Sequence, residues 1–116
     1  KAFMIFKDIL KKNPNDLGAN FQLGKINYEL NDLNQSILFF KKCNQIQANT
    51  PSILFNLALS LQSIGKINEA KKQYLKLISI NPNDVKSYYG LFFLDITNIN
   101  SNYYNKLQSL IKNQHI

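Results

Sequence analysis

Asn-Pro-Asn-Asp, the sequence of residues 13–16, occurs again at residues 81–84. The prolines of the two copies lie 68 residues apart, which is twice 34. Ala48 lies midway between the two prolines, and just beyond it Thr50 and Pro51 form a strong helix start, because a hydroxyl cap precedes a proline in the first turn. Self-similarity at a fixed period of this size is the signature of repeat architectures. The spacing therefore predicts a 34-residue structural repeat.

Similar side chains recur at the same interval elsewhere. The sets spaced by 34 residues are Leu23, Leu57 and Leu91; Phe6, Phe40 and Tyr74; Ile9, Cys43 and Leu77; and the small residues Ala2, Ser36 and Ala70. Within each unit the apolar residues follow helical spacing, and no segment alternates convincingly with a period of two. We therefore predict helices near residues 2–12, 16–30, 33–46, 50–63, 67–79, 84–97 and 102–113. The first is a second helix without its upstream partner.

A 34-residue helix-turn-helix period with this pattern resembles the tetratricopeptide repeat (TPR) family. The matching residues are Leu23-Gly24, Ser36, Phe40 and Ala48 in one unit, and Leu57-Ala58, Leu61, Ala70, Tyr74 and Pro82 in the next. The resemblance implies an all-α fold, a right-handed superhelical solenoid of antiparallel helix pairs with about seven helices. Small residues at Gly24 and Ser36, and at Ala58 and Ala70, would let the two helices of each pair approach closely.

We expect one TPR domain over residues 1–116. Its parts are the second helix of a truncated repeat at 1–14, full repeats at 17–50 and 51–84, and a degenerate terminal repeat at 85–116. In the last part Phe92 and Tyr104 replace the small residues, while Asp95 and Gln108 replace aromatic ones. Such a hairpin cannot close as tightly, as is common for the ends of repeat arrays. Because the chain begins without Met, we expect a fragment.

Composition and charge agree with a folded, non-membrane protein. Hydrophobic residues make up 45% of the 116 and charged residues 18%, and no apolar stretch approaches the ~20 residues that span a bilayer. The single cysteine cannot form an internal disulfide, and we expect a cytoplasmic location. The net charge is +7, and every basic residue that contributes to it is a lysine. Most of the lysines fall on second helices, on what the resemblance makes the convex face, so nucleic-acid binding without arginine or a stacking platform is disfavoured.

Residues for catalysis, cofactors or metals are not grouped in the sequence. The four glycines are dispersed and form no phosphate loop, and His115 is the only histidine. Cys43 falls on an apolar stripe, where a small core side chain is expected. We therefore predict no catalytic site, no cofactor and no metal, and a chain that is not an enzyme.

The resemblance implies that first helices line a concave groove in which a protein or peptide partner lies. The corresponding groove residues are Phe21, Gln22, Lys25 and Tyr28, then Phe55, Asn56, Leu59 and Gln62, then Lys86, Tyr89 and Phe93. Phe21, Phe55 and Tyr89 form an aromatic row, which either faces the groove as binding anchors or packs inward between helices. A two-carboxylate clamp is disfavoured, because only Asn56 and Lys86 match the residues that some TPR domains use for it.

Two alternatives to a simple peptide-binding module stay open. Residues 88–111 loosely resemble the last unit of proteins in which TPR repeats precede a sulfotransferase or glycosyltransferase domain, so the chain could be the N-terminal scaffold of a larger transferase. The ends also predict self-association. Apolar stripes there would lack a covering helix, namely Phe3, Ile5, Phe6, Ile9 and Leu10 at the start and Tyr103, Leu107, Leu110 and Ile111 at the end.

Overall fold

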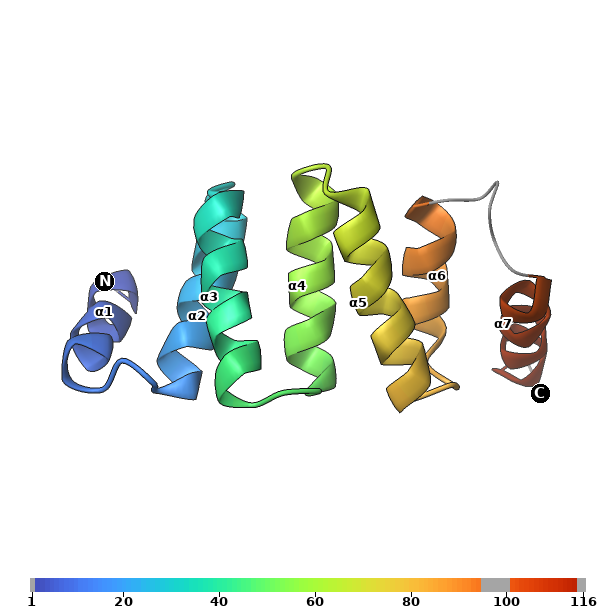
Figure 1. Cartoon of the computed structure of the whole chain (residues 1–116), viewed down its shortest axis with the longest axis horizontal. Coiled ribbons are helices and arrows are strands. Elements are labelled where there is room, and N and C mark those ends of the chain that lie inside the picture. Colours follow the sequence, from blue (N-terminus) through green and yellow to red (C-terminus); the bar gives the residue numbers. More distant parts are fainter. Residues whose placement is uncertain (1, 95–100, 115–116) are drawn as a thin grey trace.

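The computed structural model describes residues 2–94 and 101–114, and these form seven α-helices (Figure 1). The helices are α1 (Ala2–Lys12), α2 (Leu17–Glu29), α3 (Leu33–Ile46), α4 (Pro51–Ser63), α5 (Ile67–Ile80), α6 (Val85–Leu94) and α7 (Ser101–Gln114). No described residue lies in a strand. The predicted all-α repeat and its seven helices are confirmed, whereas the predicted departure at Asp95 and the tail residue His115 lie outside the described residues.

Local sequence explains where the helices begin and turn. The Asp16 carboxylate accepts a hydrogen bond of 2.8 Å from the Ala19 N–H and so caps α2. The short turns inside the two middle hairpins, α2–α3 and α4–α5, contain Asn31 with φ of 62° and Gly65 with φ of 89°. Asn and Gly tolerate this left-handed conformation best, so the equivalent turns use equivalent residues.

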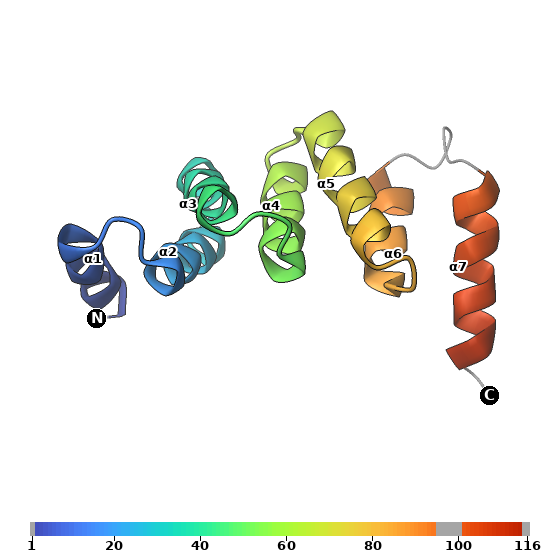
Figure 2. The same cartoon turned by 60° about the horizontal axis from the view of Figure 1, so that its bottom comes forward.

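Successive helices pack against their neighbours along the chain, so the molecule grows in one direction and measures 48 × 28 × 23 Å. Figure 2 shows α3 and α5 on one side of this array and α2, α4 and α6 on the other. We call the side made by α2, α4 and α6 the first-helix face. The α2 and α4 helices also contact each other directly.

Small residues bring the helices of the first hairpin together. The Ser36 hydroxyl donates a hydrogen bond of 2.9 Å to the Gly24 carbonyl oxygen, and its oxygen lies 2.9 Å from that of Ser60 in the following unit. A β-carbon added at Gly24 would lie only 2.7 Å from the Phe40 ring. The predicted close approach of Gly24 and Ser36 is confirmed. The structure adds Ser60, which ties this hairpin to the next.

Two clusters, each shared by adjacent units, hold most of the buried core. One contains Ile37, Phe40, Leu57, Leu61 and Ala70. The other contains Leu54, Ala58, Tyr74, Leu77, Ile78, Tyr88, Leu91 and Leu107. Since each cluster draws on more than one hairpin, no unit buries its apolar face alone, as expected for a solenoid. Cys43 is also fully buried, which confirms its predicted place on the apolar stripe.

The two ends of the chain differ from each other in how far their apolar stripes are covered. On α7, Leu107 is only 4% exposed, and Tyr103, Leu110 and Ile111 pack against the second core cluster. The prediction of an uncovered apolar stripe at this end is therefore wrong, because α7 turns that stripe toward α6. On α1 no residue is buried, and Met4 and Ile5 are each 58% exposed. The N-terminal stripe is thus covered less than the stripe on α7, although Phe3, Phe6 and Leu10 are half-buried.

The terminal hairpin is built around large side chains. The rings of Phe92 and Tyr104, which occupy the positions held by small residues in the other units, are tilted against each other with centroids 6.1 Å apart.

None of the helices in the described part of the chain is long and apolar enough to cross a membrane.

Candidate functional site: two pockets on the first-helix face

All eleven residues predicted to line a groove lie on α2, α4 or α6, and each is at least partly exposed. The structure does not gather them into one site. Six of them line a pocket between α4 and α6, one lines a second pocket between α2 and α4, and four lie outside both.

The larger of these two pockets has a volume of about 330 Å³, and we call it the aromatic pocket. Its lining residues are Phe55, Leu59, Gln62, Tyr74, Lys86, Tyr89, Gly90 and Phe93. Four of the eight are aromatic, and Lys86 is the one charged residue among them. Tyr74 and Gly90 were not among the groove residues predicted from the sequence.

Tyr74, on α5, is the buried aromatic residue of this pocket's lining. Its hydroxyl donates a hydrogen bond of 2.9 Å to Oε1 of Gln62, and its ring stands edge-on to Phe55 with centroids 6.2 Å apart. A β-carbon at Gly90 would overlap the Tyr74 ring, so α6 can lie this close only because residue 90 is glycine. Burial raises the pKa of Tyr74 to about 12, and the phenol therefore stays neutral at physiological pH. A glycine inside an otherwise apolar helix is the sequence signal for this close approach.

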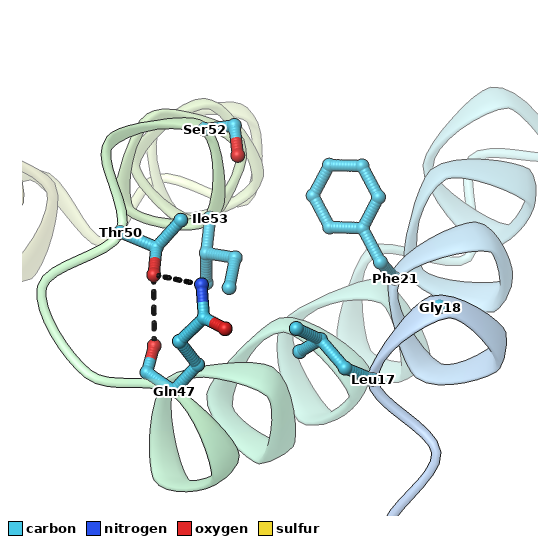
Figure 3. Close-up of a pocket in the computed structure, with 7 residues that line it drawn as sticks. All are labelled: Leu17, Gly18, Phe21, Gln47, Thr50, Ser52 and Ile53. Atoms are coloured by element: carbon cyan, nitrogen blue, oxygen red, sulfur yellow. Dashed lines mark hydrogen bonds between the residues drawn. The ribbon is translucent and has the colours of Figure 1, made fainter.

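The second pocket, of about 240 Å³, lies between the N-terminal ends of α2 and α4 (Figure 3). Leu17, Gly18 and Phe21 line it from α2, and Gln47, Thr50, Ser52 and Ile53 line it from the α3–α4 connection and α4. The Gln47 amide donates to the Thr50 hydroxyl oxygen over 2.8 Å, and that hydroxyl donates to the Gln47 carbonyl oxygen over 3.2 Å. These polar groups satisfy each other, which leaves the pocket an apolar depression with a fixed polar edge.

The aromatic row divides between the two alternatives left open by the sequence. Phe21 and Phe55 are half-buried, and each ring packs edge-on against an aromatic residue of the second helix in its own hairpin; for Phe21 and Phe40 the centroids lie 5.7 Å apart. Each ring nevertheless borders a pocket. Tyr89 is 52% exposed and presents much of its ring to the surface.

The remaining four predicted groove residues line neither pocket, and three of them make other contacts. The Asn56 amide donates over 2.7 Å to the carbonyl oxygen of Ser52 in its own helix. The Tyr28 and Ser63 hydroxyls lie 3.2 Å apart and link α2 to α4. The Lys25 ammonium lies 5.7 Å from the centroid of the Phe21 ring. Gln22 is half-buried and lines neither pocket.

Chemistry for catalysis is not assembled among the described residues. Burial raises the pKa of the Cys43 thiol to about 11, so it is not a thiolate at neutral pH. Residues 2–94 and 101–114 contain no group of three His, Cys, Asp or Glu side chains placed to hold a metal. The exposed Lys41 lies 3.9 Å from Glu69, which is the ordinary charge pairing of a solvated helix face.

Comparison with solved structures gives the same fold. A MamA double mutant (RS-1 ArsTM) superposes with a TM-score of 0.86 at 15% identity, over 97% of this chain and 65% of that one. MamA 41-end from Desulfovibrio magneticus RS-1 gives 0.85 at 15% identity, over 97% and 66%. A further MamA crystal structure gives 0.77 at 19% identity, over 95% and 63%. The chain thus spans just under two thirds of the length of these structures.

The sequence comparisons identify the family. A search of curated proteins gave no match. The family model described as "Tetratricopeptide repeat" matches residues 17–50 and 51–84, which is more than half of the chain. This chain therefore belongs to the tetratricopeptide repeat family.

Proposed function

We propose that the chain is a non-catalytic interaction scaffold whose first-helix face holds an extended peptide or a partner domain. Tetratricopeptide repeats generally mediate protein–protein interaction, which supports the general class. The observation that carries the proposal for this face is the aromatic pocket, where Tyr89 and Phe93 remain 52% and 77% exposed beside Phe55. Large exposed aromatic side chains that cluster at a depression are typical of binding anchors.

The experiment is a calorimetric titration of the whole chain with a partner recovered by affinity purification and then prepared pure. The double variant Phe55→Ala/Tyr89→Ala should weaken binding by roughly ten- to a hundredfold, because buried aromatic anchors dominate interface energy. Leu75→Ala serves as the matched control, since Leu75 is an exposed apolar residue on α5 that lines neither pocket. Unchanged affinity in a double variant that keeps its circular-dichroism spectrum would refute the assignment of this face.

The transferase alternative has less support. Neither the matched family nor the similar MamA structures are named as transferases. That alternative rests on the loose resemblance of residues 88–111, part of which lies outside the described residues. Reading the complete gene tests it, because a downstream sulfotransferase or glycosyltransferase domain would be required.

A further inference from the structure

We infer that the aromatic pocket takes one bulky apolar side chain of an extended peptide, and that an acidic residue beside it pairs with Lys86. This inference rests on the proposed function and names the partner's chemistry. The pocket is lined by residues of α4, α5 and α6, which are neighbours in Figures 1 and 2. Four of its eight lining residues are aromatic, against one of seven in the second pocket.

The shape and lining of the pocket favour a single apolar group. A volume of about 330 Å³ lies near the lower end of the ~300–1,000 Å³ typical of ligand sites, so it suits one large side chain rather than a whole small molecule. Phe55, Leu59, Tyr89 and Phe93 supply apolar walls. Tyr74 and Gln62 satisfy each other, since the Tyr74 hydroxyl donates a hydrogen bond to Oε1 of Gln62. Burial of an apolar side chain is therefore the main available source of affinity.

The charge at the pocket predicts which residue lies next to the apolar side chain in the bound peptide. Lys86 is exposed, and among the described residues no ion pair includes its ammonium group. The acidic residue nearest to Lys86 in the sequence is Asp84, and its carboxylate already accepts two hydrogen bonds at the start of α6. One of its oxygens accepts from the Lys86 backbone N–H over 3.3 Å, and the other accepts from the Ser87 hydroxyl over 2.9 Å. No acidic residue lines either pocket.

Complementary charge therefore favours an acidic peptide. The net charge of +7 attracts acidic segments over a distance, and Lys86 provides the local contact. A pair of carboxylates held in a clamp is not supported, because Asn56 is bonded within its own helix and residue 90 is glycine. One carboxylate beside one apolar anchor is the pattern that this surface complements.

The test is a selection from a displayed library of random 12-residue peptides on the whole chain. Selected peptides should share a Phe, Leu, Ile or Met with an Asp or Glu within two positions of it. In parallel, selection on Lys86→Glu should keep the apolar residue and replace the acid by Lys or Arg. This exchange of the flanking charge is the most specific expected result.

A synthetic peptide carrying the selected sequence then allows a quantitative comparison. Replacing its apolar residue by Ser should weaken binding by roughly 10- to 100-fold, because the burial of one large side chain is lost. Lys86→Gln should weaken it by about 2- to 5-fold and abolish the preference for Asp over Asn, as expected for an exposed charge pair. Lys76→Gln removes the same charge from α5, outside the pockets, and should leave that preference intact.

The outcomes separate this inference from the proposed function. Peptides that bind and compete with each other, lose affinity in Phe55→Ala/Tyr89→Ala, but show no acidic preference would overturn the inference and keep the function. Peptides indifferent to both sets of variants would overturn both. Failure to select any peptide would overturn the inference, whereas a partner protein sensitive to the Phe55→Ala/Tyr89→Ala change would still support the function.

Discussion

The α2–α3 and α6–α7 hairpins occupy equivalent places in the first and third units, yet they close in different ways. In the first, Gly24 faces Ser36, and a hydrogen bond of 2.9 Å joins the two helices directly. In the last, Phe92 faces Tyr104 at equivalent positions, with ring centroids 6.1 Å apart. Side-chain volume at two positions thus sets how closely the helices of a unit approach.

This difference bears on function because the candidate site uses the unit that departs from the pattern. Tyr89, Gly90 and Phe93 all belong to α6, the first helix of the terminal hairpin. The regular hairpins supply Phe55 and the supporting Tyr74. The regular part of the chain is therefore the support, and the irregular part brings the exposed rings and the lysine to it.

A large side chain placed inside a regular hairpin should lower the stability of the fold most. Ala70→Phe should cost about 1 to 3 kcal/mol by overpacking a fully buried site. Ser36→Phe should cost at least as much, because the hydrogen bond to the Gly24 carbonyl is also lost. The exposed neighbours Leu38→Phe and Lys72→Phe serve as controls. Melts showing the buried variants as stable as the controls would mean that the repeat register is wrong.

A smaller substitution tests the two glycine contacts. Alanine at Gly24 or Gly90 would push against the Phe40 or Tyr74 ring, and we expect a net cost of about 1 to 2 kcal/mol after the gain of up to ~1 kcal/mol in helix propensity. Gly18→Ala is the control, because its nearest neighbour would lie at 3.5 Å and only the propensity gain applies. Gly90→Ala should also weaken peptide binding, whereas Gly24→Ala should not. Equal effects at all three glycines would contradict the close packing.

Alkaline pH should weaken the regular hairpins. Burial raises the pKa of Cys43 from 9.0 to about 11 and that of Tyr74 from 10.0 to about 12. Above pH 9 the unfolded chain loses protons that the folded chain keeps, so this stability is complete below pH 9 and is lost as pH rises toward 12. Urea midpoints at pH 8 to 11 should decrease, and Cys43→Ala should show a shallower decrease. A parallel decrease in the variant would remove Cys43 from this explanation.

The smallest expected effect is weak self-association through α1. Its Ile9 is 36% exposed, whereas the equivalent Cys43 and Leu77 are at most 2% exposed because a first helix covers them. Sedimentation across a concentration series should show larger species at high concentration, and Ile5→Lys should suppress them. Ser109→Lys, at an exposed position on α7, should not. A chain that stays monomeric at every concentration would contradict self-association through the exposed apolar residues of α1.

The repeat made most of the fold predictable, since positions 34 residues apart had to serve the same structural role. Leu23, Phe40 and Tyr74 each belong to a set of residues spaced by 34, and all three are buried. The end at α7 could not be predicted, because its stripe of apolar residues is the same whether it faces outward or turns back onto α6. The alternation of residues along one helix does not specify which neighbour it contacts.

The candidate site was only partly accessible for a related reason. The first-helix positions of the family indicated Phe55 and Tyr89, but the pocket also depends on how close α5 comes to α6. That approach is set by Gly90, which takes the place of Gln22 and Asn56 in the preceding units. A pattern shared by many repeats predicts their common framework and omits the departures that make one surface different from another.

Amide hydrogen exchange of the free chain, resolved by residue, tests most directly whether small residues close the regular hairpins and large ones loosen the last. The structure predicts the slowest exchange in α3, α4 and α5, whose buried residues belong to clusters shared between units, and markedly faster exchange in α7. Exchange in α7 as slow as that in α4 would contradict this account, because it would show that the Phe92–Tyr104 hairpin is as firmly closed as the others.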